Sequence, residues 1–85
     1  MAYSIAFAKA AKRQFDKLPG PAQRRLGDVI AALAVDPRPP GVVKLTGEDR
    51  LYRMRGGDYR VIYQVQDERL LVLVVKVGHR REVYR

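Results

Sequence analysis

Residues 51–65, LYRMRGGDYRVIYQV, contain two stretches rich in aromatic and branched side chains on either side of Gly56-Gly57-Asp58. Such residues favour β-strands, and the two stretches show an alternating pattern. Glycine adopts the positive φ that tight hairpin turns require. The pattern therefore predicts a β-hairpin, with strands at 51–55 and 59–65 joined by a three-residue connection.

Three further stretches have the character of strands. Residues 70–77 are nearly all leucine or β-branched, which predicts a central strand buried on both faces. Residues 42–45 predict a shorter strand, followed by a turn. Near the N-terminus, Tyr3, Ile5 and Phe7 alternate with small or polar residues, which predicts one more short strand.

Two segments between these strands have helical periodicity. In residues 8–18, apolar side chains recur three or four positions apart, and Pro19-Gly20 ends the segment after about 11 residues. Pro21 is favourable in the first turn of a second helix. The buried stripe of that helix is predicted to be Leu26, Val29, Ile30 and Leu33. The prolines of DPRPPG, residues 36–41, cannot continue it.

The order of these elements predicts the fold class. A chain of 85 residues is enough for one domain. A strand, two helices and then strands joined by tight turns are typical of the α+β class. We therefore predict a single α+β domain over residues 1–85, in which two N-terminal helices pack on one face of a mainly antiparallel, four-stranded sheet.

The composition restricts the classes of function. Seventeen Lys and Arg against nine Asp and Glu give a net charge of +8, which predicts a polyanionic partner, nucleic acid first. A merely solubilising surface is the alternative. The absence of cysteine excludes disulfides and thiolate metal sites and agrees with a reducing compartment. No apolar run is long enough for a membrane span or a secretion signal, so we expect a cytoplasmic protein that acts without a membrane.

Three arginines are predicted to converge on one face of the sheet. Arg53 and Arg55 are two positions apart in one strand, so their side chains leave the sheet on the same side. Alternation in the next strand places Arg60 opposite that pair. Guanidinium groups bind phosphate in a bidentate manner, which favours an anion site. A solvated, partly salt-bridged sheet face is the alternative.

The C-terminal residues GHRREVYR, 78–85, add further candidates. Histidine changes charge near neutral pH, so His79 could act in proton transfer, although a lone histidine is more often structural. Arg80 should face the opposite way from His79. Tyr84 could stack on a base or anchor the chain end in the core. No cluster of metal ligands and no phosphate-binding glycine loop is present, so we expect no metal, cofactor or small-molecule substrate.

Residues 51–65, preceded by Lys44-Leu45 and followed by VGHRREVYR, closely resemble the RelE branch of the RelE/ParE toxins of bacterial type II toxin–antitoxin systems. The resemblance spans nearly the whole chain. It implies two helices on a curved antiparallel sheet, as in small microbial ribonucleases. It also implies cleavage of messenger RNA in the ribosomal A site, through metal-independent attack of a ribose 2′-OH on the adjacent phosphate.

The resemblance also implies roles for individual residues. Arg53 and Arg55 occupy positions where RelE has two functional lysines, and Arg60 matches a phosphate-binding arginine. Arg80 matches the arginine that protonates or stabilises the leaving group, and Tyr84 matches the tyrosine that stacks on the nucleotide. Because arginine stays protonated near neutrality, Arg53 should act as an electrostatic clamp. The general base is then open: His79 is one candidate, and Tyr84 or solvent are the others.

Family logic implies two partners. One is a cognate antitoxin, acidic in its toxin-binding segment, in a neutralising complex that represses its own operon. The other is the ribosome with its A-site mRNA, for which the sequence offers these basic docking residues: Lys9, Lys12, Arg13, Lys17, Arg24, Arg25, Lys44 and Arg81. Two other functions compete with RNA cleavage: inhibition of DNA gyrase, as in ParE toxins, and nucleic-acid binding without catalysis by an inactivated toxin.

Overall fold

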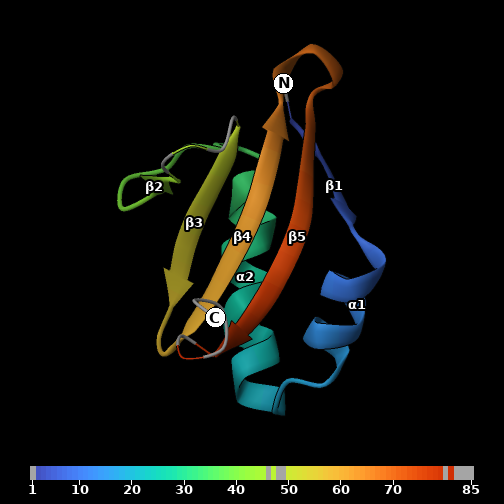
Figure 1. Ribbon diagram of the computed structural model, residues 1–85, viewed down its shortest axis with the longest axis vertical. Helices are drawn as coiled ribbons and strands as arrows, with labels where there is room; N and C mark the ends of the chain where they lie inside the picture. Colours follow the sequence, from blue (N-terminus) through green and yellow to red (C-terminus); the bar gives the residue numbers. More distant parts are fainter. Residues whose placement is uncertain (1, 46, 48–49, 80, 82–85) are drawn as a thin grey trace.

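The computed structural model describes residues 2–45, 47, 50–79 and 81. Five strands form one sheet in the order β1-β5-β4-β3-β2. Helix α2 crosses behind β3 and β4, and α1 packs beside β5 (Figure 1). In chain order the elements are β1 (Ser4–Phe7), α1 (Lys9–Asp16), α2 (Gly20–Leu33), β2 (Val43–Lys44), β3 (Leu51–Gly56), β4 (Tyr59–Gln66), the 3-10 turn η1 (Asp67–Arg69) and β5 (Leu71–His79).

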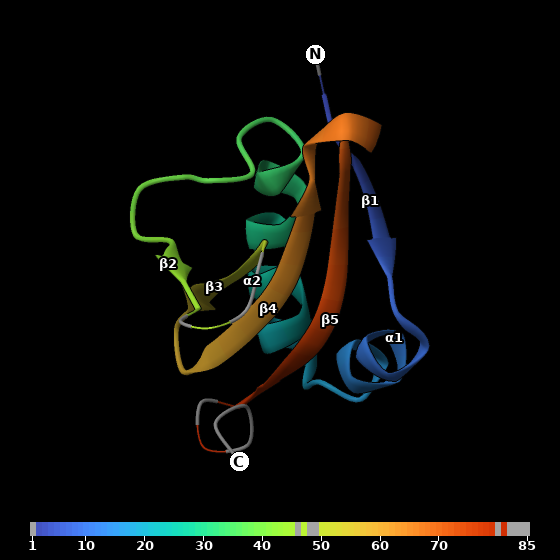
Figure 2. The ribbon, with the colours of Figure 1, turned by 45° about the horizontal axis from the view of Figure 1, so that its top comes forward.

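The α+β class with two helices on a mainly antiparallel sheet is confirmed, but the sheet has five strands where four were predicted. Strand β1 joins the edge and runs parallel to β5, whereas the other pairs are antiparallel. Figure 2 shows β1 and β5 side by side, with α1 following directly from the end of β1. Helix α1 covers eight residues, shorter than the predicted 11, because Lys17 already closes it as C-cap.

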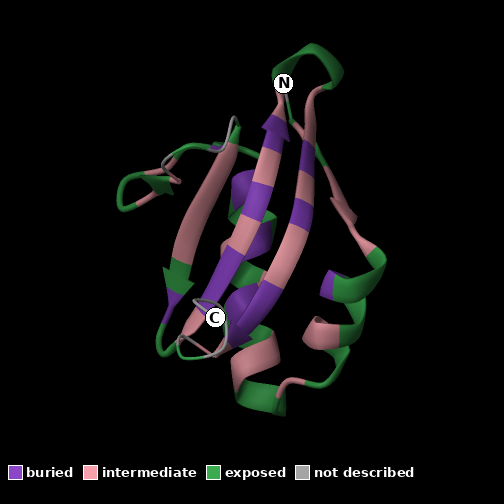
Figure 3. Ribbon diagram, viewed as in Figure 1, coloured by how far each residue is buried: buried purple, intermediate pink, exposed green. Residues whose placement is uncertain are grey.

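Strand β5 is not the central strand, which corrects a second prediction. The sheet order places β4 in the middle and β5 between β1 and β4. Along β5, Val72 and Val74 are buried while Leu71 and Leu73 are half-buried (Figure 3). The helices cover one face of the sheet only, so an apolar strand in this sheet is fully buried on that face alone. We call the other face, which carries Leu71 and Leu73, the open face.

The core lies between α2 and the helix-facing side of the sheet. Leu26, Ile30 and Leu33 of α2 are almost completely buried, as the helical spacing predicted, whereas Val29 of the predicted stripe is half-buried. Tyr63, the largest fully buried side chain, meets them from β4. Its hydroxyl donates a 2.7 Å hydrogen bond to the carbonyl of Pro37, so the Pro-rich loop after α2 is attached directly to the core.

The β3–β4 hairpin is tighter than predicted. Gly56 pairs with Tyr59, so the turn contains two residues rather than three. Gly57 has φ +64°, and Asp58 is not left-handed, which is the pattern of a type II′ turn. Gly56 belongs to β3 and is buried against α2, where a Cβ would lie 2.9 Å from Cδ2 of Leu26. Glycine at 56 therefore lets the hairpin approach the helix.

A polar cluster at the other end of the sheet holds the loop of residues 36–41. Arg38 makes two hydrogen bonds to the carboxylate of Asp67, at 3.2 and 2.8 Å, and its Nε donates to the hydroxyl of Tyr52 at 3.0 Å. Tyr3 donates to the same carboxylate at 2.6 Å. The cluster therefore connects the residue before β1, β3, η1 and the loop that leads to β2.

Neither helix of the described part of the chain is long and apolar enough to cross a membrane.

Candidate functional site

The three arginines predicted to converge do so on the open face. Arg55 pairs directly with Arg60 across the hairpin, and Arg53 pairs with Ile62 on one side and Val43 on the other. Residues paired in this way have side chains on the same face of the sheet. The prediction that Arg60 lies opposite the Arg53/Arg55 pair is therefore confirmed.

The arginines line a small pocket of about 150 Å³. We call it the arginine pocket; its lining consists of Gly41, Val43, Arg53, Arg55 and Arg60. None of these five described residues is acidic. Three guanidinium groups around one hollow create a strongly positive potential, and their planar donors match the oxygen geometry of a phosphate group.

The three side chains differ in exposure. Arg60 is only 9% exposed, Arg53 is half-buried and Arg55 is exposed. Arg53 and Arg60 each also have an interaction partner within the folded chain. A buried guanidinium has few rotamers open to it, so Arg60 is held in position before any ligand arrives. Such preorganised charge is what stabilises a transition state most effectively.

His79 does not join the arginines. Its register partner is Tyr59, which lies on the helix-facing side of β4, and the two rings meet edge to face with centroids 5.5 Å apart. Gly78, one position earlier, is the partner of Arg60 on the open face. The position of His79 therefore gives no support to the prediction that it deprotonates a nucleotide held by the arginine pocket.

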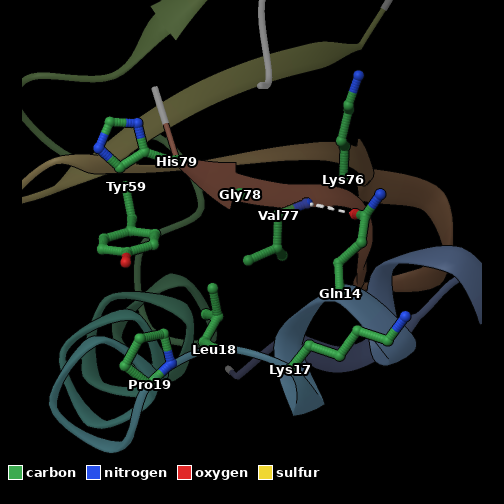
Figure 4. Close-up of a pocket in the computed structure, with 9 residues that line it drawn as sticks. All are labelled: Gln14, Lys17, Leu18, Pro19, Tyr59, Lys76, Val77, Gly78 and His79. Atoms are coloured by element: carbon green, nitrogen blue, oxygen red, sulfur yellow. Dashed lines mark hydrogen bonds between the residues drawn. The ribbon is translucent and has the colours of Figure 1, made fainter. Parts of the chain in front are cut away.

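His79 instead borders a larger pocket, of about 540 Å³, between the end of β5 and the segment that joins α1 to α2 (Figure 4). The backbone N–H of Arg81 donates to Nδ1 of His79 at 3.3 Å. Of the other predicted C-terminal site residues, Arg80 and Tyr84 lie outside the described residues.

The predicted docking residues are all exposed, as expected for a surface that meets a polyanion. Lys9, Lys12 and Arg13 lie on α1, Lys17 caps its end, and Arg24 and Arg25 lie on α2. Lys44 lies on β2, and Arg81 follows β5. Lys12 makes an i,i+4 salt bridge to Asp16 at 2.7 Å. Lys44 pairs with Tyr52, so it faces away from the arginine pocket.

The sequence did not identify Gly41 and Val43 as walls of the arginine pocket. Val43 fell within the predicted short strand at 42–45, but its pairing with Arg53 depends on the course of the loop before it. Gly41, which has φ +90°, turns the chain out of that loop. Among the described residues, no group of three or more His, Asp or Glu side chains could hold a metal ion.

Comparison with known proteins agrees with this architecture. A family model described as the ParE toxin of type II toxin–antitoxin systems matches residues 5–84. The mRNA interferase toxin RelE of Escherichia coli is 34% identical over 88 residues, which cover 99% of this chain and 92% of that protein. Toxin RelG of Mycobacterium tuberculosis is 30% identical over 89 residues, covering 100% and 99% of the two chains.

A solved structure is similar to this chain in both sequence and fold. The toxin chain fold recurs in the crystal structure of the intact E. coli RelBE toxin–antitoxin complex, with a TM-score of 0.81 and 31% identity over 92% of this chain and 96% of that chain. Sequence and fold thus agree along almost the whole length, and the chain belongs to the RelE/ParE family of toxins of type II toxin–antitoxin systems.

Proposed function

We propose that this protein is the toxin of a type II toxin–antitoxin pair and acts as an endoribonuclease that cleaves mRNA on the ribosome. The observation that carries this proposal is the arginine pocket: three guanidinium groups, one of them buried, around a hollow of phosphate size. The similarity to a protein named mRNA interferase supports the same activity. The ribosome would present the mRNA and add contacts that a small toxin cannot make alone.

The proposed reaction is a transesterification. The ribose 2′-oxygen attacks the adjacent phosphorus, its proton passes to a base, and the bond to the 5′-oxygen of the next nucleotide breaks. The products are a 2′,3′-cyclic phosphate and a 5′-OH. Negative charge grows on the phosphoryl oxygens during attack, and Arg53, Arg55 and Arg60 stabilise it. Because these cations supply the charge stabilisation, the proposed reaction requires no metal ion.

The remaining roles stay with the residues that the family resemblance assigns. Arg80 protonates or stabilises the leaving 5′-oxygen, and Tyr84 stacks on the nucleotide. His79 is separated from the arginine pocket by the sheet, so the base is Tyr84 or solvent in this proposal. We expect the cognate antitoxin to cover the arginine pocket with an acidic segment. The E. coli relative is found in such a toxin–antitoxin complex, RelBE.

Ribosome-dependent cleavage tests the proposal. Primer extension on mRNA from a translation reaction should show codon-phased cuts with the wild-type protein, and only when ribosomes are present. Arg60→Gln should slow cleavage by about 100- to 1000-fold, the usual effect of removing one donor from a transition-state site. Arg69→Gln, which removes an exposed arginine of η1 outside the arginine pocket, is the matched control and should change the rate little.

Two outcomes would contradict the proposal. Gyrase-dependent DNA cleavage without mRNA cleavage would support a ParE-like function. The matching family model is named for the ParE toxin. Absence of both activities in a folded protein would support nucleic-acid binding by an inactivated toxin.

A further inference from the structure

The larger pocket beside His79 has a composition suited to RNA. Two cations, Lys17 and Lys76, and two rings, Tyr59 and His79, line its rim and wall (Figure 4). None of its nine lining residues is acidic. Cations interleaved with aromatic rings are the features by which proteins hold single-stranded RNA: the cations meet phosphates and the rings stack on bases.

The edge of β5 that faces β1 borders this second pocket. Strand β1 pairs with β5 only along residues 71–74, so among the described residues no strand covers the later part of β5 on that side. There the side chain of Gln14 in α1 accepts a 2.9 Å hydrogen bond from the backbone N–H of Val77. Lys76, whose register partner is Ile62, lies on the open face, and it borders the pocket from above the strand (Figure 4).

The two pockets lie back to back on the same strand ends. Arg60 lines the arginine pocket, and its register partner Gly78 lines the second one. Tyr59 precedes Arg60, and neighbouring residues of a strand are about 3.3 Å apart and point to opposite faces. A polynucleotide that leaves the arginine pocket over the edge of β5 therefore meets the cation of Lys76 and then the pocket.

We propose that this second pocket is a nucleotide subsite that binds the RNA residue next to the scissile phosphate. The base of that residue packs on the Tyr59–His79 pair, and Lys76 and Lys17 contact the phosphates on either side of it. This inference rests on the proposed function, since it assumes that RNA occupies the arginine pocket. It gives the protein a second point of contact with its substrate, separate from the site of bond cleavage.

Nuclear magnetic resonance on the complete, ¹⁵N-labelled protein locates the RNA. The probe is a short single-stranded RNA that carries a 2′-O-methyl group throughout, so it binds but is not cleaved. The side-chain amide of Gln14 and the backbone amide of Val77 report on the pocket, because both residues line it. A hydrogen bond joins the two groups. Both signals should shift on titration with the RNA, in parallel with signals of the arginine pocket.

Paired variants measure the contribution of the two cations. Lys17→Gln/Lys76→Gln should weaken RNA binding by about tenfold and reduce the slope of log affinity against log salt by about 1.4, or about 0.7 for each phosphate contact. The control, Arg50→Gln/Arg69→Gln, removes the same charge from exposed positions that do not line the pocket. It should change the affinity by less than about threefold.

An altered RNA tests the stacking without altering the protein. An abasic nucleotide is placed on each side of the scissile position in turn. One of the two RNAs should bind about tenfold more weakly than the intact RNA, since base–aromatic stacking contributes strongly in single-strand sites. In the His79→Ala variant, the difference between that RNA and the intact RNA should shrink.

The outcomes separate this inference from the proposed function. If mRNA is cleaved but Gln14 and Val77 do not respond to RNA, or if both paired variants bind alike, the subsite is wrong and the proposed function stands. If an acidic peptide shifts these signals and RNA does not, the pocket is a protein-binding site and the inference also fails. A wild-type protein that cleaves no mRNA overturns the proposed function, whatever the titration shows.

Discussion

At the scale of single residues, the difference between Arg55 and Arg60 is the most informative feature of the site. The two are register partners, yet Arg55 is exposed and Arg60 is 9% exposed. A buried guanidinium depends on its fixed, forked donors, whereas an exposed cation acts mainly through its charge. Arginine and lysine are therefore not equivalent at position 60 and are closer to equivalent at position 55.

This asymmetry predicts different responses to a charge-conserving change. Arg60→Lys should reduce the rate of mRNA cleavage by roughly 100-fold, because a flexible ammonium group replaces a preorganised donor. Arg55→Lys should retain activity within about tenfold, since lysine supplies the same charge at an exposed position. Single-turnover cleavage rates on programmed ribosomes measure both. Equal losses in the two variants would contradict the assigned roles.

Tyr63 connects the core to the Pro-rich loop, and its hydroxyl is buried. Burial raises the pKa of this hydroxyl well above its usual value. Tyr63→Phe should lower the free energy of unfolding by about 1–3 kcal/mol, because the carbonyl of Pro37 then loses its partner inside the protein. Denaturant unfolding measures the change.

Tyr3→Phe is the control for Tyr63→Phe. Its hydroxyl donates to Asp67 at an exposed site, where water can replace the bond. Its loss of stability should be clearly smaller. An equal loss in the two variants would mean that burial does not determine the effect.

At the scale of elements, the contact between the β3–β4 hairpin and α2 holds the arginine pocket in place. Gly56 lies one position after Arg55, and a side chain at 56 would point at Leu26. Leu26 is fully buried and cannot move aside at low cost. Val29 of α2 is also close, because its Cγ2 lies 3.4 Å from the place that a Cβ at 56 would occupy. Any side chain at 56 must therefore push the hairpin away from the helix.

Gly56→Ala should cost about 1–3 kcal/mol of stability, as overpacked cores do. It should also reduce cleavage, because the displaced hairpin carries Arg55 and Arg60. Gly20→Ala is the control: a Cβ there meets only an exposed arginine, Arg24, at 3.6 Å. This change should be neutral or should stabilise the protein by up to about 1 kcal/mol. Thermal unfolding and cleavage assays on both variants test the prediction, which fails if Gly56→Ala is as stable as wild type.

The elements themselves were largely predictable. Both helices, the hairpin and the strands follow from local periodicity and from glycine and proline positions, which act over a few residues. Which strands pair with which was less predictable. The parallel place of β1 beside β5 and the pairing of Val43 with Arg53 bring together residues far apart in the chain, and no local pattern encodes such contacts.

At the scale of the whole molecule, the Arg38–Asp67 cluster holds together segments from both halves of the chain. Asp67 accepts hydrogen bonds from Arg38 and Tyr3, which lower its pKa to about 2. A carboxyl group whose pKa is lower in the folded state than in the unfolded chain stabilises the fold above its unfolded value, near 4. That contribution is lost as the pH falls from about 4 towards 2.

Asp67→Asn should therefore lower the melting temperature at neutral pH, where the ionised carboxylate contributes fully. The difference from wild type should narrow as the pH is lowered from about 4 to 2, because the wild type then loses the same interaction. Thermal unfolding followed by circular dichroism over this range measures the gap. Asp16→Asn, which removes an exposed helix salt bridge to Lys12, is the control and should show a smaller difference at neutral pH. A gap that stays constant with pH would contradict the role of Asp67.

The cations that give the net charge of +8 lie in different regions of the molecule. The arginine pocket lies on the open face, while the exposed cations of α1 and α2 lie on the helix side. Lys17 and Lys76 border the second pocket between these regions. The composition predicted a polyanionic partner, but only the fold separates a phosphate site from the surrounding docking surface.

The sequence by itself determined the class of fold, the two helices, the hairpin and the convergence of Arg53, Arg55 and Arg60, because each depends on short-range periodicity. Only the tertiary structure decided where His79 lies. Tyr63 of β4 pairs with Val74 of β5, while Ile62 pairs with Lys76, so Val75 is an extra residue in β5 that interrupts the alternation. This irregularity moves Lys76 and Gly78 to the open face and His79 to the helix side. Strand alternation cannot reveal such a shift, because a bulge depends on the partner strand as well as on the strand that contains it.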